Sequence, residues 1–219
     1  MKHSLSARQC TFAAALAVAL GLCAFYFSPL RAEAKIAYVA AFLALTLALH
    51  CLREGTRAWW MVGGLLLSAV GDWMVARHDF LLQMGAFMLA HVAYILHFLR
   101  LRRPARRLPL LLTGTAVVAL CLTVAVRVLP GVEQSIVFWG VGLYSLVIST
   151  MLLAACLTGR TGYWAGAAAF VASDFILAWN KFVAPVTDAH WWIMVPYYGA
   201  QLLLWATAWN DSKKNSKHA

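Results

Sequence analysis

The chain has 219 residues, of which 63% are hydrophobic and 12% charged, and its formal net charge at pH 7 is +10. Soluble domains are about half apolar and about a quarter charged, so this composition excludes an ordinary soluble domain. The net charge does not indicate nucleic acid as a partner. The positive residues lie in short segments between apolar runs, as the topology determinants of membrane proteins do.

Apolar runs of about twenty residues recur along almost the whole chain, each long enough to cross a hydrocarbon core of about 30 Å as a helix. Lipid admits only helices and closed barrels, and these runs lack the alternation of barrel strands. The sequence therefore predicts an all-α fold, a polytopic transmembrane bundle of about eight helices in a single membrane domain over residues 1–219. The predicted spans lie near 11–28, 36–52, 59–76, 80–99, 108–129, 133–157, 162–181 and 191–209.

The distribution of Lys and Arg predicts how these spans are oriented. The two termini and the loops on the same side carry 13 of the 18 Lys and Arg residues. Because cytoplasmic segments are enriched in positive charge, we expect both termini in the cytoplasm, as an even number of spans requires. We therefore expect a multi-pass protein of a bacterial inner membrane.

The five cysteines are scattered along the chain and form no CxxC pair. This pattern indicates neither a disulfide framework nor a zinc site, and we expect neither a metal nor another cofactor. We interpret the cysteines as small polarizable side chains that fill space in the bundle.

Two of the eight acidic residues, Asp72 and Asp174, lie well inside predicted spans, where a carboxylate costs at least about 2.5–3.5 kcal/mol to insert. Segments 69–76 and 171–178 share one pattern: a small residue, Asp, an aromatic residue, two apolar residues and Ala. Both spans run outward, and at about 1.5 Å per residue both aspartates lie roughly 18–20 Å from the cytoplasmic face. We expect the two carboxyls to face one cavity. The alternative is that each hydrogen-bonds a neighbouring helix.

Other polar residues within the spans accompany the aspartates. His91 and Tyr94 are three positions apart and share a face of the fourth span, and Tyr197 and Gln201 share a face of the eighth. Lys35 opens the second span on the outer side. The alternatives are an interhelical hydrogen bond for His91 and interface anchors for the tyrosines and the lysine.

In their order along the chain, these positions resemble the YhhN-like lysoplasmalogenase family of membrane hydrolases. The resemblance covers roughly residues 35–205. One departure is that Ile36-Ala37 follows Lys35, where the family has Pro-Leu. The matching segments are Ser68–Asp72, Gly85–Phe87 with His91 and Tyr94, Ser173-Asp174, Leu177-Ala178, Asn180–Phe182 and Tyr197–Gln201, with Lys35 before them.

The resemblance implies hydrolysis of the vinyl ether bond of lysoplasmalogens, which gives a fatty aldehyde and glycerophosphoethanolamine or glycerophosphocholine. It implies a lysophospholipid as substrate and membrane lipid as surroundings. The residues that it implies are Asp72 and Asp174 for catalysis, and Lys35, His91, Tyr94, Asn180, Tyr197, Tyr198 and Gln201 for substrate binding.

The chemistry of a vinyl ether agrees with a pair of carboxyls. Protonation of the β-carbon gives an oxocarbenium ion that water then attacks, which requires one proton donor and one carboxylate that stabilises the cation or activates water. Two-carboxylate glycosidases divide these tasks in the same way. Two other functions stay open: a transporter of lipids or small molecules that uses paired intramembrane acids, and a hydrolase of another lipid bond with a metal held by His91 and the aspartates.

Overall fold

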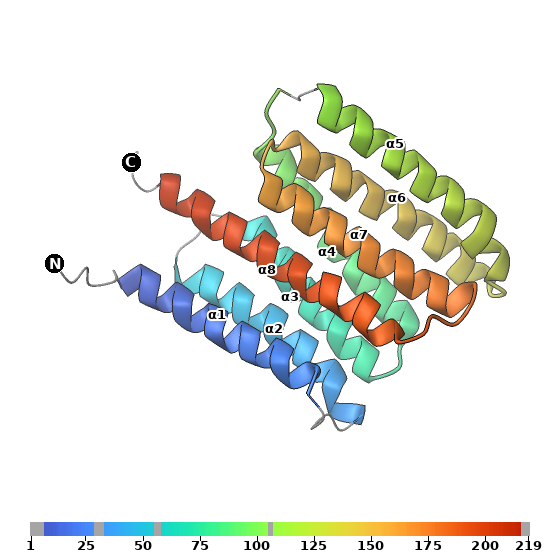
Figure 1. Ribbon diagram of the computed structural model, residues 1–219, viewed down its shortest axis with the longest axis horizontal. Coiled ribbons are helices and arrows are strands. Elements are labelled where there is room, and N and C mark those ends of the chain that lie inside the picture. The colour runs from blue at the N-terminus through green and yellow to red at the C-terminus, as the bar shows by residue number, and fades with distance from the viewer. Residues whose placement is uncertain (1–6, 29–32, 55–57, 105–106, 216–219) are drawn as a thin grey trace. The chain divides into compact units, whose positions relative to one another are not determined.

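The computed structural model describes residues 7–28, 33–54, 58–104 and 107–215, with side chains throughout except at 33–37 and 214–215. These ranges contain eight α-helices and no strand, which confirms the predicted all-α fold (Figure 1). A short π-helix, Val124–Val128, and a 3-10 helix, Leu129–Gly131, follow the fifth helix. The helices are α1 (Ala7–Tyr26), α2 (Glu33–Arg53), α3 (Trp59–Ala76), α4 (Phe80–Arg100), α5 (Arg107–Thr123), α6 (Ser135–Leu157), α7 (Thr161–Phe182) and α8 (Ala189–Asn215).

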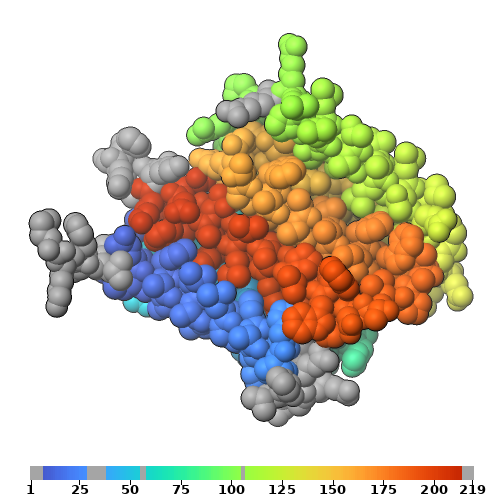
Figure 2. All heavy atoms as spheres, viewed as in Figure 1, coloured from blue at the N-terminus to red at the C-terminus, as the bar shows by residue number. Residues whose placement is uncertain are grey.

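Five helical segments of the described chain are long and apolar enough to cross a membrane: α1, α3, α4, α6 and the segment Arg107–Gly131. Only 11% of the most apolar window in Arg107–Gly131 is buried, and Figure 2 shows the side chains of α5, in green to yellow, forming an outer surface. Apolar surface on this scale is stable only against lipid. The chain is therefore a multi-pass membrane protein, whereas eight complete spans and a cytoplasmic location of both termini stay predictions.

The described chain packs as two compact units, Met1–Ala90 with Ala208–Ala219 and His91–Thr207. The divisions fall inside α4 and α8, so both helices contribute residues to each unit. Organisation as a single membrane domain stays a prediction.

In the first unit, α2 packs against both α1 and α3 (Figure 1). Leu43, Ala44, Leu47 and Ala48 of α2 have no exposed surface. Their spacing of three and four positions places them on one face of the helix, and the two alanines let a neighbouring helix approach closely. This alternation of small and large residues explains why α2 lies in the interior of its unit.

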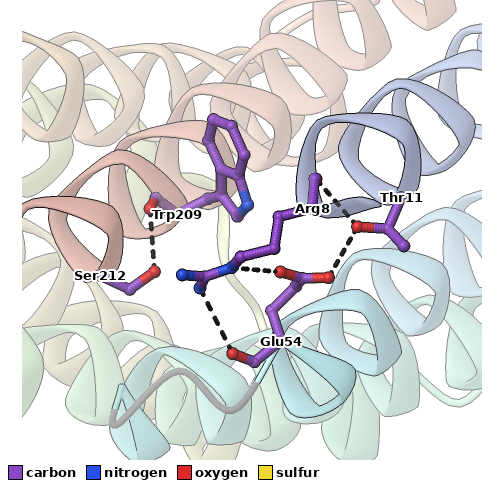
Figure 3. Close-up of polar contacts among 5 residues, drawn as sticks. All are labelled: Arg8, Thr11, Glu54, Trp209 and Ser212. Atoms are coloured by element: carbon purple, nitrogen blue, oxygen red, sulfur yellow. Dashed lines mark hydrogen bonds and ion pairs between the residues drawn. The ribbon is translucent and has the colours of Figure 1, made fainter. Parts of the chain in front are cut away.

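An ion pair fastens α1 to the end of α2 (Figure 3). Arg8 Nε donates to Glu54 Oε2 at 2.8 Å, and Thr11 Oγ1 donates to Glu54 Oε1 at 2.6 Å. One helical turn further along α1, Phe12 stacks on Trp209, with 4.1 Å between ring centroids. The Lys213 ammonium lies 4.2 Å from the centroid of the same indole ring. The end of α8 is thereby joined to α1.

Burial by itself would raise the pKa of the Glu54 carboxyl. The hydrogen bonds from Thr11 and Arg8 and the positive charge of Arg8 outweigh burial, and the pKa is lowered from its ordinary value of 4.5. The Glu54 side chain is 6% exposed, so solvent screens this ion pair less than it would an exposed pair.

We expect this ion pair to weaken as the solution becomes acidic. Because the folded-state pKa is lowered, ionised Glu54 stabilises the fold above pH 4.5, and this contribution is lost as the pH falls through the lowered value. Replacing Glu54 by Gln should lower the free energy of unfolding by about 1–2 kcal/mol at neutral pH. Below the lowered pKa the variant and the wild type should converge. Thermal unfolding of the detergent-solubilised protein across this pH range measures both effects.

Glu133→Gln is the matched control, because Glu133 is an exposed glutamate. If Glu54→Gln unfolds like the wild type at neutral pH, the ion pair contributes nothing to stability.

In the second unit, α6 lies between α5 and α7, and the three helices run side by side (Figure 1). Glycine permits close approach at several places, including Gly166 and Gly131. A Cβ on Gly166 of α7 would lie 2.9 Å from Leu204 Cδ2 and 3.3 Å from the Ala200 carbonyl oxygen of α8. A Cβ on Gly131 would overlap the carbonyl oxygen of Phe182, at the end of α7. The segment after α5 that contains Gly131 therefore packs directly against the backbone at the end of α7.

Replacing Gly131 by Ala should destabilise the protein by about 1–3 kcal/mol, because a backbone carbonyl cannot move aside as a side chain can. Gly114→Ala in α5 is the control, because a Cβ there meets nothing within 4 Å. That change should be neutral or stabilising, since alanine favours a helix more than glycine does. Thermal unfolding in detergent compares the two variants. Equal melting temperatures would contradict the close contact at Gly131.

Candidate active site

Asp174 of α7 lies among side chains from two other helices of the second unit. The Tyr144 hydroxyl of α6 donates a short hydrogen bond to Asp174 Oδ2. His91 Nε2 of α4 lies 3.9 Å from the same carboxyl oxygen. The Asp174 side chain is 15% exposed, so part of it stays accessible. Carboxyl, phenol and imidazole groups, which can all exchange protons, thus meet around one oxygen atom.

His91 has no exposed surface, and neither of its ring nitrogens has a hydrogen-bond partner among the described residues. Its ring lies edge-on to Tyr144, at 5.3 Å between centroids, and to Phe170, at 4.7 Å. A buried polar group without a partner is costly, and such exceptions commonly mark a functional role or a position that water or a ligand completes. The interhelical hydrogen bond considered for His91 is absent from this part of the structure.

A second set of polar side chains lies on the other side of the Phe170 ring, which contacts both His91 and Tyr94. The Tyr94 hydroxyl donates to Gln201 Oε1 at 3.4 Å, and Gln201 Nε2 donates to the Tyr197 hydroxyl at 3.0 Å. The last bond confirms that Tyr197 and Gln201 share a helical face. The Phe170 ring lies edge-on to Tyr197, at 5.3 Å, and also contacts His91. Phe170 therefore separates the Gln201 group from the group around Asp174.

The remaining residues expected in the site have different surroundings. Asn180 Oδ1 accepts the backbone N–H of Val186 at 2.8 Å and so closes the turn after α7, which is a structural contact. Tyr198 is buried, with 3% of its surface exposed. Lys35 belongs to the first turn of α2, and its side chain lies outside the described residues.

Asp72 belongs to α3 in the first unit and is 5% exposed. Ser68, one helical turn before it, is fully buried. A Cβ on the adjacent Gly71 would lie 2.8 Å from the Phe87 ring, so this glycine lets the ring of α4 pack closely beside the aspartate. Asp72 and Asp174 lie in different units, and their meeting in one cavity stays a prediction.

Sequence reasoning missed Tyr144 and Phe170. A tyrosine in the middle of a predicted span was a signal for the first, whereas a phenylalanine among apolar residues offers none.

The structure also has an apolar cavity of about 230 Å³, and the first of its lining residues directly follows Asp174 in the sequence. Its walls are Phe175, Ile176, Trp179, Val186 and Trp192. Among the described residues, no three His, Cys, Asp or Glu side chains gather as metal ligands would.

Comparison with known proteins gives the family. The model of the YhhN family matches residues 30–208. Lysoplasmalogenase TMEM86B of Rattus norvegicus is 34% identical over 195 residues, which are 85% of this chain and 80% of the relative. A lysoplasmalogenase of Mycobacterium tuberculosis is 32% identical over 182 residues, or 78% and 67% of the two chains. No solved structure matches the chain. This chain therefore belongs to the YhhN family.

Proposed function

We propose that this protein hydrolyses the vinyl ether bond of lysoplasmalogens, giving a fatty aldehyde and glycerophosphoethanolamine or glycerophosphocholine, with Asp72 and Asp174 as its acid–base pair. Its class is that of its relatives: the chain is an enzyme, an ether hydrolase. The observation that carries the proposed site is the Asp174 carboxyl, which accepts the Tyr144 hydroxyl and lies 3.9 Å from His91.

The reaction begins with transfer of a carboxylic acid proton to the β-carbon of the vinyl ether. The carbon–oxygen portion becomes an oxocarbenium ion, which the second carboxylate stabilises while water adds to the α-carbon. The hemiacetal that forms then collapses, so that the carbon–oxygen bond to glycerol breaks and the aldehyde leaves. The added water gives a proton to one aspartate, which passes it to the glycerol oxygen as the hemiacetal collapses. The other aspartate takes the hemiacetal hydroxyl proton and is again a carboxylic acid. The two-carboxylate glycosidases use the same logic.

Tyr144 and His91 act as positioning residues for Asp174 in this mechanism. The Tyr144 hydroxyl and His91 Nε2 both approach Oδ2 of Asp174. The other carboxyl oxygen, Oδ1, is therefore the one that faces the substrate or the attacking water. His91 has buried nitrogens that have no partner among the described residues, and a water molecule or the substrate ether oxygen supplies the missing partner. The ring contacts of His91 with Tyr144 and Phe170 hold the imidazole in place.

The depth of the aspartates supports a single-chain lipid as substrate. With both termini in the cytoplasm, Asp72 and Asp174 lie roughly 6–11 Å below the outer surface, at about 1.5 Å per helical residue. A lysolipid with its head group at the interface places its ether bond near this depth, and its chain runs deeper. Lys35 at the outer boundary is then a candidate contact for the phosphate. The aromatic walls of the cavity beyond Asp174 suit a head-group ammonium.

Replacing either Asp72 or Asp174 by Asn should reduce turnover at least about a hundredfold, because Asn keeps the size but cannot transfer a proton. Release of fatty aldehyde from a lysoplasmalogen by the purified protein is the measurement. Asp188→Asn is the matched control, since Asp188 is exposed and has φ 52°, which asparagine also adopts readily. Near-normal turnover in either variant would remove that aspartate from the pair.

Replacing Tyr144 by Phe should lower kcat roughly tenfold with little change in KM, because the Asp174 carboxyl loses its positioning hydrogen bond. The pH profile of kcat should shift as well, which loss of packing alone would not produce. Tyr163→Phe is the control, because the Tyr163 hydroxyl also lies in a buried contact with a histidine, 3.1 Å from His97 Nε2. If both variants have the same kinetics, Tyr144 has no particular role in positioning Asp174.

A further inference from the structure

A larger cavity, of about 530 Å³, opens at the arginine-rich end of the second unit. The loop after α4, the first turns of α5, the end of α6 and the start of α7 all contribute walls to it. Arg160, at one wall, precedes Asp174 by 14 positions, which corresponds to about 20 Å along a helix. The cavity is therefore separate from the candidate active site.

The charged residues around this cavity are all positive. Arg103 and Arg160 line it, together with Thr161. The described residues that line the cavity include no Asp or Glu, and residues 91–132 and 134–173 contain none. A cavity with this charge is complementary to an anion.

Another part of the cavity wall is apolar and faces outward. Leu108 and Leu112 of α5 are 67% and 63% exposed, and Trp164 of α7 is 44% exposed. In Figure 2 the side chains of α5 form the margin of the second unit on this side. Since the chain lies in a membrane, these side chains meet lipid hydrocarbon, and the cavity is open to the bilayer along this wall.

Hydrogen bonds fix the walls of the cavity relative to one another. Trp164 Nε1 donates to Thr113 Oγ1 at 3.2 Å, and this hydroxyl donates to the Pro109 carbonyl at 2.7 Å. The Arg103 backbone N–H donates to the Leu157 carbonyl at 2.9 Å. The loop that carries Arg103 is thereby attached to the end of α6. The arginines and the apolar wall thus belong to one preformed cavity.

We propose that this cavity binds an anionic phospholipid. Arg103 and Arg160, with the Thr161 hydroxyl, hold the phosphate, and one acyl chain lies against Leu108, Leu112 and Trp164. Basic cavities between membrane helices suit anionic head groups in this way. A zwitterionic lipid also has a phosphate, but the arginines repel its ammonium. This site is independent of the proposed vinyl ether hydrolysis.

The test uses the full chain in nanodiscs that contain phosphatidylglycerol and phosphatidylcholine in equal amounts. Native mass spectrometry after release into detergent identifies the lipids that stay bound. We expect phosphatidylglycerol to be enriched roughly tenfold over phosphatidylcholine on the wild type. The double variant Arg103→Gln/Arg160→Gln should bind the two lipids about equally. Leu112→Trp, which narrows the cavity without changing charge, should also lose the enrichment.

The matched control is Arg102→Gln/Arg107→Gln, which removes the same charge from exposed positions that do not line the cavity. It should keep the enrichment of phosphatidylglycerol. In pure phosphatidylcholine both double variants should melt like the wild type, and only the cavity variant should lose the rise in Tm that phosphatidylglycerol causes. Equal loss of enrichment in the two double variants would mean that diffuse electrostatic attraction, and not this cavity, selects phosphatidylglycerol. That result would overturn the proposal. Displacement of the lipid by millimolar inorganic phosphate would also overturn it, because the site would then recognise phosphate alone.

Discussion

A carboxyl group inside a helix bundle requires neighbours that replace the water it has lost, and the polar interior of the second unit follows from this requirement at Asp174. Tyr144 supplies a hydroxyl from α6, and His91 brings its imidazole from α4 to within 3.9 Å. These contacts restrict the rotation of α4 and α6 about their axes, because another rotation would direct the two groups away from the carboxyl. The same rule applies to Gln201, whose amide is satisfied by Tyr94 and Tyr197.

Besides these polar contacts, α7 packs closely against α8. Gly166 admits the backbone of α8 on one side, and Ser173 donates to the Ile193 carbonyl of the same helix at 2.8 Å. Asp174 follows Ser173 directly, so the hydrogen bond that fixes α7 against α8 also fixes the helical turn that carries the carboxyl. Small residues in a membrane helix act here through what they allow to approach, rather than through contacts of their own.

Hydropathy was sufficient to predict the helices, because a lipid-embedded helix must satisfy its own backbone. The predicted spans 59–76 and 80–99 match α3 and α4 closely. The predicted span 108–129 ends differently: α5 gives way to a short π-helix at Val124 and then to a 3-10 helix that ends at Gly131. Pro130 lacks the N–H that a helix needs, so it favours this ending.

The candidate site was predictable only where spacing within one helix decides it. Tyr197 and Gln201 share a face because they are four positions apart. The partner of Asp174 is Tyr144, 30 residues away on another helix. Nothing local in the sequence records that contact, which depends on how α6 and α7 are rotated against each other.

The contrast between Arg107–Gly131 and α7 has a consequence for biosynthesis. The former reaches a mean hydropathy of 2.2 and buries little of its surface, so it can leave the translocation machinery for lipid without help. Helix α7 bears Asp174 and is not among the strongly apolar helices of the described chain. As a predicted span, α7 should enter the membrane more favourably once α6 is there to shield its carboxyl. Synthesis from the N-terminus provides that order, since the ribosome completes Tyr144 before it reaches Asp174.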